Sequence, residues 1–256
     1  EDVCQVAYGY GLFTGGLGLH YGVERIGATV VPISAGNTKR QLMLMQDLGT
    51  TAIACTPSYA LMMGETIRDQ KIDMTNFKLR VGIFGAEPWT EGMRSEIERL
   101  LNIRALDIYG LTEVYGPGIG MSCDYACGMH YWDDYLYFEI IDPKTGRAAP
   151  DGEVGELVIT TLRKQGAPLI RYRTHDLTRF LPGDCPCGSP YPRIDTILGR
   201  TDDMVKVRGV NIFPGQIDEL LSGIDGASSE YQVMVDHLNG RDILTLFVEL
   251  EPGRAT

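Results

Sequence analysis

Four residues that could do chemistry follow an apolar segment near the middle of the chain. Residues 104–108 (Arg-Ala-Leu-Asp-Ile) predict a strand, which is followed at once by Tyr109, Gly110, Thr112 and Glu113. Ligands of an open α/β sheet bind at the carboxyl ends of its strands. There a tyrosine ring can stack on a base, glycine lets a backbone approach, threonine can bond a phosphate oxygen, and glutamate can hold Mg²⁺. The alternative interpretation is a strand that ends in an ordinary polar turn.

A second strand end carries residues of the same types. Residues 79–84 predict a strand that runs into residues 85–88 (Gly-Ala-Glu-Pro), and residues 91–101 have the pattern of an amphipathic helix. Gly85 permits the close approach of a flat group. Because two successive strand ends each carry glycine and glutamate, a nucleotide could lie across them.

The elements that would position these residues alternate between helix and strand. Residues 20–26 and 41–48 predict helices, whereas residues 28–33 and 52–55 predict strands. This alternation indicates an α/β fold with a Rossmann-like parallel sheet and crossover connections. Hydroxyl residues after the later strand, such as Thr56, are best explained as a helix N-cap.

The segment at residues 6–18 is rich in glycine and aromatic residues. One interpretation is a strand end followed by a tightly packed helix that carries glycines. The other is a wall of an apolar substrate pocket, in which Tyr8, Tyr10, Gly11 and Phe13 contact an acyl or aryl group. A phosphate-binding glycine loop is not predicted, because the segment has no Gly-Lys-Ser/Thr sequence.

The order of these motifs is similar to that of a known family. Gly-Ala-Glu-Pro at 85–88, followed by Asp-Ile-Tyr-Gly-Leu-Thr-Glu at 107–113, resembles the phenylacetate-CoA ligase branch of the adenylate-forming enzymes. The resemblance implies that the first segment borders adenine, the tyrosine packs on adenine, the threonine meets the α-phosphate and the glutamate aids Mg²⁺ binding. The implied nucleotide contacts are Gly85, Ala86, Glu87, Pro88, Asp107, Tyr109, Gly110 and Thr112, and the implied catalytic residues are Thr112 and Glu113.

The pattern changes to short strands after residue 122. Residues 135–141 and 156–161 predict strands with turn residues between them, which indicates a small antiparallel sheet or a β-barrel-like subdomain. We therefore divide the chain into an α/β nucleotide- and acyl-binding region at 1–122, a β-rich subdomain at 123–199, and a hinge with the start of an α+β lid at 200–256.

Cysteine and histidine residues flank this β-rich segment. Cys123, Cys127 and His130 precede its strands, and Cys185 and Cys187 follow them. Structural Zn²⁺ sites use four such ligands and keep no open position, so five candidates leave one spare. The family resemblance favours Cys123, His130, Cys185 and Cys187, with Cys127 as the spare. The alternative is a set of unrelated thiols, because the Cys-x-Cys spacing is tighter than usual.

A charged segment ends the next predicted strand, at residues 168–177. Asp176 could accept hydrogen bonds from both ribose hydroxyls, and Arg173 could hold a phosphate or orient Asp176. By themselves the two residues favour the alternative interpretation, a surface ion pair between them. Arg-Tyr-Arg-Thr-x-Asp resembles the ribose-binding segment of the same family, which implies that Asp176 contacts ribose.

The last part of the chain has its own α+β pattern. Residues 199–212 predict a turn and a short hairpin, residues 213–220 begin a helix, and residues 232–235 and 243–250 form a hairpin across Asn239-Gly240.

This part resembles the hinge and the first half of the moving lid of the family. The resemblance implies that Asp202 is the hinge residue, that Arg200 contacts the nucleotide, and that Gly209 lies near the thioester-forming channel.

Composition excludes several classes of partner. Of 256 residues 44% are apolar, and the formal net charge of −11 argues against nucleic acid or an anionic membrane, since both need basic patches. No apolar run reaches the roughly 20 residues that span a bilayer. Six cysteines are too few for a disulfide scaffold, so we expect a cytoplasmic protein with Cys4 and Cys55 in its core.

The resemblance covers nearly the whole chain. It implies ATP-dependent ligation of CoA to an aryl or arylacetic acid through an acyl-adenylate intermediate, with phenylacetate as the leading candidate for the acid. The implied partners are a small-molecule carboxylic acid, ATP or AMP, CoA, Mg²⁺ and structural Zn²⁺, and the implied assembly is a homodimer. The family's upstream phosphate loop and downstream lysine are not in the chain, so we expect a fragment that adenylates poorly alone. Two rivals are an adenylating enzyme with a carrier-protein acceptor and a catalytically silent, zinc-stabilised nucleotide-binding module.

Overall fold

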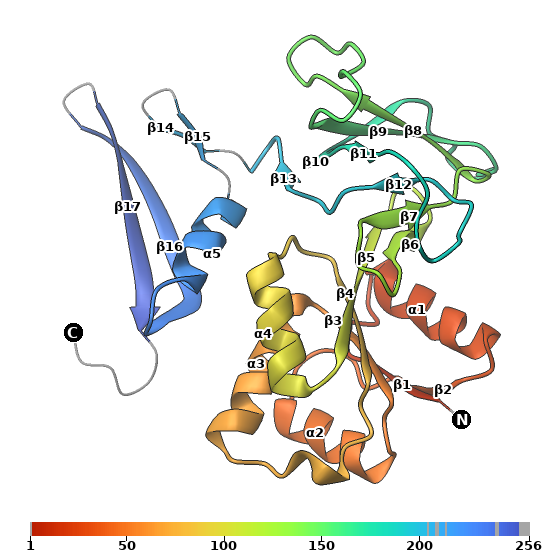
Figure 1. Ribbon diagram of the computed structural model, residues 1–256, viewed down its shortest axis with the longest axis vertical. Helices are drawn as coiled ribbons and strands as arrows, with labels where there is room; N and C mark the ends of the chain where they lie inside the picture. Colours follow the sequence, from red (N-terminus) through yellow and green to blue (C-terminus); the bar gives the residue numbers. More distant parts are fainter. Residues whose placement is uncertain (1, 204, 208–209, 213, 239–240, 251–256) are drawn as a thin grey trace.

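The computed structural model describes residues 2–203, 205–207, 210–212, 214–238 and 241–250. A nine-stranded sheet carries the helices of the first half of the chain, and a four-stranded sheet and two hairpins follow it (Figure 1).

Five parallel strands form one half of the large sheet, in the order β2-β1-β3-β4-β5. Their bounds are Val3–Val6 (β1), Thr29–Val31 (β2), Ala52–Cys55 (β3), Val81–Gly85 (β4) and Arg104–Leu111 (β5). Helices cover both faces, which is why strands such as Ala52–Cys55 are apolar on both sides instead of alternating. The predicted α/β class is confirmed.

Four α-helices cross between these strands. They are α1 (Thr14–Arg25), α2 (Thr38–Asp47), α3 (Pro57–Asp69) and α4 (Glu91–Leu101), and a short 3₁₀ helix, η1 (Met74–Asn76), follows α3. Helix α1 packs on one face of the sheet through Val23, and α2, α3 and α4 pack together on the other around Phe84 (Figure 1). The predicted N-cap of α3 is confirmed, since Thr56 Oγ1 accepts the Tyr59 N–H at 3.3 Å.

Helix α1 begins at Thr14 and not at residue 20 as predicted. Its glycines explain the difference, because they let the first turn approach the preceding loop. A Cβ on Gly16 would lie 2.5 Å from the carbonyl oxygen of Gly9.

Antiparallel strands extend the large sheet beyond β5 in the order β6-β7-β12-β11. Their bounds are Gly116–Ser122 (β6), Met129–Tyr131 (β7), Phe180–Leu181 (β11) and Arg193–Ile194 (β12). The separate antiparallel sheet has the order β13-β10-β9-β8, with Leu136–Ile141 (β8), Gly155–Thr161 (β9), Tyr172–Thr178 (β10) and Gly199–Arg200 (β13). Residues 123–199 thus contribute to both sheets, and the domain division at residue 122 stays a prediction.

The last part of the chain contains two hairpins and one helix. Their bounds are Val205–Val207 (β14), Val210–Ile212 (β15), Pro214–Ser222 (α5), Ala227–Leu238 (β16) and Arg241–Leu250 (β17). Strands β16 and β17 pair from Ala227↔Leu250 to Leu238↔Arg241, which confirms the predicted hairpin, although β16 begins at Ala227 and not at residue 232. The turn residues 239–240 lie outside the described residues.

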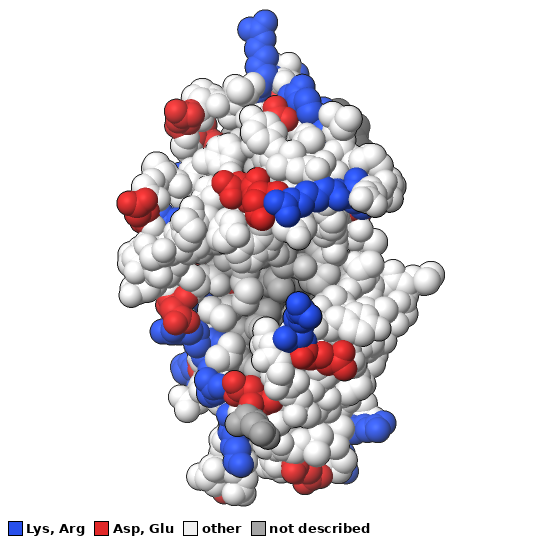
Figure 2. Space-filling view, turned by 90° about the vertical axis from the view of Figure 1, so that its right-hand side faces the viewer, with Lys and Arg blue, Asp and Glu red and all other residues white. Residues whose placement is uncertain are grey.

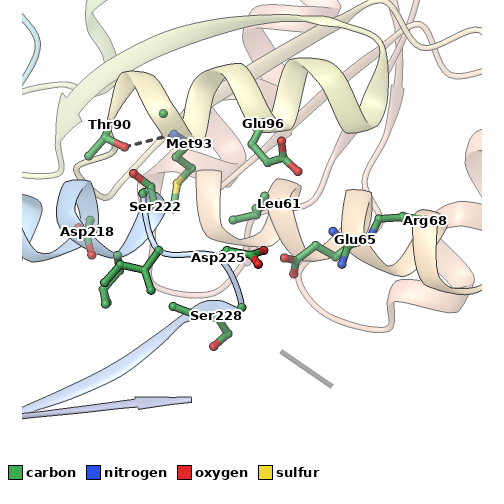
Figure 3. A pocket seen from close by; sticks show the side chains of 16 residues that line it. Leu61, Glu65, Arg68, Thr90, Met93, Glu96, Asp218, Ser222, Asp225 and Ser228 are labelled. Atoms are coloured by element: carbon green, nitrogen blue, oxygen red, sulfur yellow. Dashed lines mark hydrogen bonds between the residues drawn. The ribbon is translucent and has the colours of Figure 1, made fainter. Parts of the chain in front are cut away.

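Helix α5 docks beside α3 and α4, and a cavity of about 520 Å³ lies along this seam (Figure 3). Ile217 and Leu221 of α5 are buried. Gly92 leaves room for the approach, because a Cβ there would lie 3.3 Å from Ser222 Oγ. The seam therefore joins the last part of the chain to the face of the large sheet that carries α4.

The surface carries both signs of charge. On the face drawn in Figure 2, acidic and basic side chains are interspersed, and several lie side by side. Over the described ranges, no helix has both the length and the apolar character needed to cross a bilayer.

Candidate active site

Two cavities meet at the carboxyl ends of β4 and β5. The first, of about 180 Å³, is called the nucleotide cavity below and is lined by Ala86, Glu87, Pro88, Trp89, Asp107, Ile108, Tyr109, Gly110, Leu111, Asp176, Ile197 and Arg200. The second, of about 210 Å³, is called the acyl cavity and is lined by Tyr8, Phe13, Thr14, Gly15, Leu19, Ala86, Ile108, Gly110, Leu111, Thr112, Glu113, Gly116 and Pro117. Four residues line both, so the two cavities share one wall.

That shared wall consists of Ala86 and the end of β5. Strand β5 continues to Leu111 and not to residue 108 as predicted. The extension follows from antiparallel pairing with β6, where Gly110 faces Pro117. A Cβ on Gly110 would lie 2.2 Å from the carbonyl oxygen of Gly116, so only glycine permits this pairing. The glycine brings the two chains together and leaves the turn at Thr112 and Glu113 beside the cavities.

The segment after β4 forms the opposite side of the nucleotide cavity. Gly85 itself is not among the lining residues. A Cβ there would lie 2.1 Å from the carbonyl oxygen of Ile108, so its lack of a side chain permits the pairing of β4 with β5. Its contact with a nucleotide stays a prediction. Ala86 has φ of 73°, a strained conformation of the kind found at ligand sites. Glu87 accepts the Ser58 backbone N–H at 2.6 Å and so ties this wall to the N-terminus of α3.

Tyr109, Asp176 and Arg200 form one hydrogen-bonded group in the nucleotide cavity. Tyr109 Oη donates to Asp176 Oδ2 at 2.5 Å, and Arg200 Nη1 donates to Asp176 Oδ1 at 2.8 Å. Burial raises the pKa of Asp176, and the hydrogen bond from Tyr109 and the charge of Arg200 oppose that rise. A carboxylate has about four acceptor positions, so both oxygens keep capacity for a diol.

Asp107 brings a second carboxyl group to the same cavity. It is 7% exposed, and its backbone N–H donates to Ser122 Oγ at 2.7 Å. Burial raises the pKa of Asp107 to about 6, while the Trp89 indole and the charge of Arg94 oppose the rise. Arg94 lies over the Trp89 ring, 4.5 Å from its centroid, and so packs on a side chain that lines the cavity.

Arg173 does not orient Asp176. It pairs with the buried Glu156, with 2.9 Å between Nε and Oε1, and Arg200 takes the place beside Asp176. Asp176 lies opposite Arg200 on the neighbouring strand β13, which explains why Arg200 and not Arg173 pairs with it. Arg200 was predicted as a nucleotide contact, but its pairing with Asp176 was not predicted.

The predicted aromatic pocket is only partly brought together. Tyr8 and Phe13 line the acyl cavity, with 5.8 Å between their ring centroids. Tyr10 and Gly11 are not among its lining residues, since Tyr10 Oη is hydrogen bonded to His20 Nδ1 at 3.2 Å and Gly11 is exposed. The substrate role of all four residues stays a prediction.

Thr112 and Glu113 lie in the turn that follows β5 and line the acyl cavity. The hydroxyls of Thr112 and Thr14 are 3.1 Å apart. One hydrogen serves that contact, so the second hydroxyl hydrogen remains available to a ligand. The exposed Glu113 carboxylate has the oxygen chemistry that Mg²⁺ prefers.

Four of the five predicted metal ligands come together. The ligand atoms of Cys123, His130, Cys185 and Cys187 all lie within 4.8 Å of one another. His130 Nδ1 lies 2.8 Å from the carbonyl oxygen of Tyr191, which leaves Nε2 facing Cys187 Sγ at 3.3 Å. A ring nitrogen held by a carbonyl is the usual support for a metal-binding histidine. A hydrogen bond from the backbone N–H of Cys187 lowers the pKa of Cys185 to about 6, and the side chains of Cys187, Cys127 and His130 add to this effect. The lowered pKa favours a thiolate.

The other cysteines lie outside this group of four. Cys127 Sγ is 3.4 Å from Cys185 Sγ, but Arg193 Nη1 donates to it at 3.0 Å. Cys4 and Cys55 are buried in the core, as predicted.

The predicted hinge residue is joined to the nucleotide cavity. Arg200 Nε and Nη2 each lie 2.9 Å from one oxygen of the Asp202 carboxylate, and Asp202 is half exposed. Arg200 thus bridges the predicted ribose ligand Asp176 and the predicted hinge residue. Gly209 lies outside the described residues.

Several cavity residues were not among the predicted site residues. Thr14 contacts Thr112, although 98 residues separate them in the chain. Trp89, which follows β4, and Ile197, which lies between β12 and β13, line the nucleotide cavity. Trp89 follows the Gly-Ala-Glu-Pro segment directly, so its position next to that motif is the one usable sign.

Comparisons with known proteins agree with this geometry. A solved structure of 2-hydroxyisobutyryl-CoA ligase, in the postadenylation state in complex with 2-HIB-AMP, matches 98% of this chain and 54% of its own, at 32% identity and a TM-score of 0.90. The same enzyme in the thioesterification state, with 2-HIB-AMP and CoA, has a TM-score of 0.75, matching 97% of this chain and 54% of its own at the same 32% identity.

Sequence comparison leads to the same group of proteins. The phenylacetate-coenzyme A ligase of Pseudomonas putida is 50% identical over 97% of this chain, and the chain spans 56% of the length of that relative. A family model for the C-terminal domain of AMP-binding enzymes matches residues 209–256. The model described as AMP-binding enzyme matches residues 12–162, and this chain therefore belongs to the AMP-binding enzyme family.

Proposed function

We propose that the protein that carries this chain ligates CoA to phenylacetate or a related aryl acid, with ATP as the energy source. The acid carboxylate attacks the α-phosphorus of ATP and releases pyrophosphate. The CoA thiolate then attacks the acyl carbon of the acyl-adenylate and releases AMP. The observation that carries the proposal is the shared wall of the two cavities, which would let the nucleotide and acyl halves of one adenylate meet at the Thr112 turn.

Each half of the adenylate has a matching surface. In the nucleotide cavity, Tyr109 offers its ring to the base, and Asp176 retains acceptor positions for the two ribose hydroxyls. In the acyl cavity, Tyr8 and Phe13 offer aromatic faces to the acid. Thr112 can donate a hydrogen bond to an α-phosphate oxygen, because its hydroxyl lies on the cavity wall.

The protein's contribution to both steps is positioning and charge stabilisation, since phosphoryl transfer needs little covalent help. Bound Mg²⁺ would neutralise phosphate charge, and the exposed carboxylate of Glu113 would hold it.

We also propose a structural zinc at Cys123, His130, Cys185 and Cys187. Support comes from a donor set of three sulfurs and one imidazole nitrogen within 4.8 Å, which fits tetrahedral Zn²⁺. Four protein ligands leave no position for a substrate, so the role is to hold the chain before β7 against the loop before β12.

The lid would exchange catalytic groups between the two half-reactions. The higher TM-score against the postadenylation structure than against the thioesterification structure, at equal identity, supports a lid in the adenylation arrangement here. Asp202, which pairs with Arg200 between β13 and β14, is the proposed pivot.

The free thiols fit a reducing compartment, so a cytoplasmic enzyme is proposed. The homodimer stays a prediction, which light scattering of the purified protein would test.

The experiment that tests the function is pyrophosphate release by the complete gene product across a panel of carboxylic acids, with and without CoA. Release with phenylacetate, and phenylacetyl-CoA formation when CoA is present, is the expected result. Release without a thioester would move the proposal to a carrier-protein acceptor. AMP binding without release from any acid would leave a silent nucleotide-binding module.

A further inference from the structure

The turn that carries Thr112 and Glu113 is held by side chains from distant segments. Thr14 contacts the Thr112 hydroxyl, Tyr172 Oη lies 3.4 Å from Glu113 Oε1, and Lys164 Nζ donates to the backbone carbonyl oxygen of Glu113. Lys164 lies 51 residues further along the chain, on the segment that joins β9 to β10, and Tyr172 lies 59 residues further, as the first residue of β10. One segment of the four-stranded sheet therefore contacts both the side chain and the backbone of Glu113.

That segment is itself fixed to the sheet. The Leu169 and Arg171 backbone N–H groups each donate at 2.9 Å, to Thr161 Oγ1 and Thr160 Oγ1 of β9. Tyr172 pairs with Ile159 as the first residue of β10, and its ring packs against the apolar core between the two sheets. Because Leu169 and Arg171 are tied to β9 just before Tyr172, the tyrosine approaches the turn from a defined direction, and Lys164 lies three residues after the end of β9.

The contact of Tyr172 is with one carboxylate oxygen only. It takes Oε1, and within the described part of the chain no hydrogen bond or ion pair takes Oε2. Lys164 contacts the carbonyl and forms no ion pair with the carboxylate among the described residues, so the negative charge is retained. The arrangement fixes the direction of Glu113 and leaves one anionic oxygen open to a cation.

We propose that Tyr172 and Lys164 are positioning residues that hold Glu113 where it receives Mg²⁺ with the nucleotide triphosphate. Tyr172 sets the rotamer of the carboxylate, and Lys164 fixes the backbone from which it projects. The proposal rests on the proposed function for the identity of the triphosphate, but its test below reads metal binding directly.

The test compares Tyr172→Phe and Lys164→Gln with matched variants of the same sheet. Tyr137→Phe on β8 and Lys144→Gln in the turn after β8 make the same chemical changes away from the cavities. The complete gene product is titrated with Mn²⁺ in the presence of ATP, and bound metal is measured by electron paramagnetic resonance. Affinity for AMP without metal is measured in parallel.

We expect Tyr172→Phe and Lys164→Gln each to weaken Mn²⁺ binding in the ATP complex by about 3- to 10-fold, the usual effect of one hydrogen bond. Affinity for AMP should stay within about twofold, and the Tyr137 and Lys144 variants should match the wild type. In a Glu113→Gln background, Tyr172→Phe should have no further effect, because the group that it orients has lost its charge.

Equal losses of Mn²⁺ and AMP affinity would overturn the proposal, since they would indicate general damage to the site. Unchanged Mn²⁺ affinity in both variants would overturn it as well. This test can succeed where the test of the proposed function fails. If the two variants bind Mn²⁺ more weakly while the wild type releases no pyrophosphate with any acid, the positioning role is supported and the ligase is rejected.

Discussion

Tyr109 donates its phenol hydrogen to Asp176, with 2.5 Å between Oη and Oδ2, although 67 residues separate them in the chain. Tyr109 lies on β5 of the nine-stranded sheet and Asp176 on β10 of the four-stranded sheet. Both side chains are buried, so this bond closes the nucleotide cavity where the two sheets meet. A nucleotide bound there would contact both sheets at once.

The first prediction follows from that bond. Asp176→Asn should lower the affinity for AMP by about 10- to 100-fold, because an amide replaces a charged acceptor and must point its NH₂ at Tyr109 or at Arg200. Isothermal titration calorimetry measures the effect. Asp195→Asn, which breaks an ion pair with Arg179 and leaves the cavity lining unchanged, is the control and should bind AMP like the wild type.

The second prediction concerns pH and Asp107. Its folded pKa of about 6 lies above the unfolded value of about 3.9, so the folded chain binds this proton more tightly. The resulting contribution to stability is full below the unfolded pKa and is lost as pH rises through 6. Asparagine cannot ionise, so Asp107→Asn does not lose this stability as pH rises. The free energy of unfolding of the variant minus that of the wild type should therefore increase between pH 4 and 7, by at most about 3 kcal/mol. Urea unfolding at several pH values measures it, and a constant difference would contradict it.

The sequence predicts which segments form the site because strand, glycine and carboxylate signals are local, although some strand bounds differ, as for β5, which ends at Leu111 and not at residue 108. Residues 52–55 and 91–101 have the predicted bounds, and the four metal-ligand candidates meet. The pairing of Arg200 with Asp176 could not be predicted, because it depends on the antiparallel register of β13 with β10, which brings together residues 24 apart in the chain. Likewise Tyr10 and Gly11 have the same composition signal as Phe13, and what keeps Tyr10 out of the cavity lining is a tertiary contact, its hydrogen bond with His20 of α1.

The third prediction uses the spare cysteine as a control for the metal site. Cys185→Ser should lower the zinc content of protein grown with zinc from about one per chain to near zero, with a lower Tm. Cys127→Ser should keep the zinc, because its thiol lies outside the group of four. Elemental analysis by mass spectrometry measures both. Equal zinc in the two variants would reject the assigned ligands.

The fourth prediction compares two glycines of α1. Gly22→Ala should raise the free energy of unfolding by about 0.5–1 kcal/mol, since no atom lies within 4 Å of the new methyl group and alanine favours helix. Gly18→Ala should lower it by about 1–3 kcal/mol, because its Cβ would lie 2.5 Å from Pro117 Cγ, on a rigid ring. Urea unfolding of the two variants gives the comparison, and stabilisation by both would contradict the packing of α1 on β6.

The central claim is that the two cavities are the two halves of one acyl-adenylate site. Its most direct test is the affinity of this chain for a non-hydrolysable phenylacetyl-adenylate analogue, compared with AMP, in wild type, Asp176→Asn and Phe13→Ala. We predict that the analogue binds at least about 100-fold more tightly than AMP, as intermediate analogues do. Asp176→Asn should weaken both ligands, whereas Phe13→Ala should weaken only the analogue. An analogue that binds no more tightly than AMP, or that is insensitive to Phe13→Ala, would contradict the account.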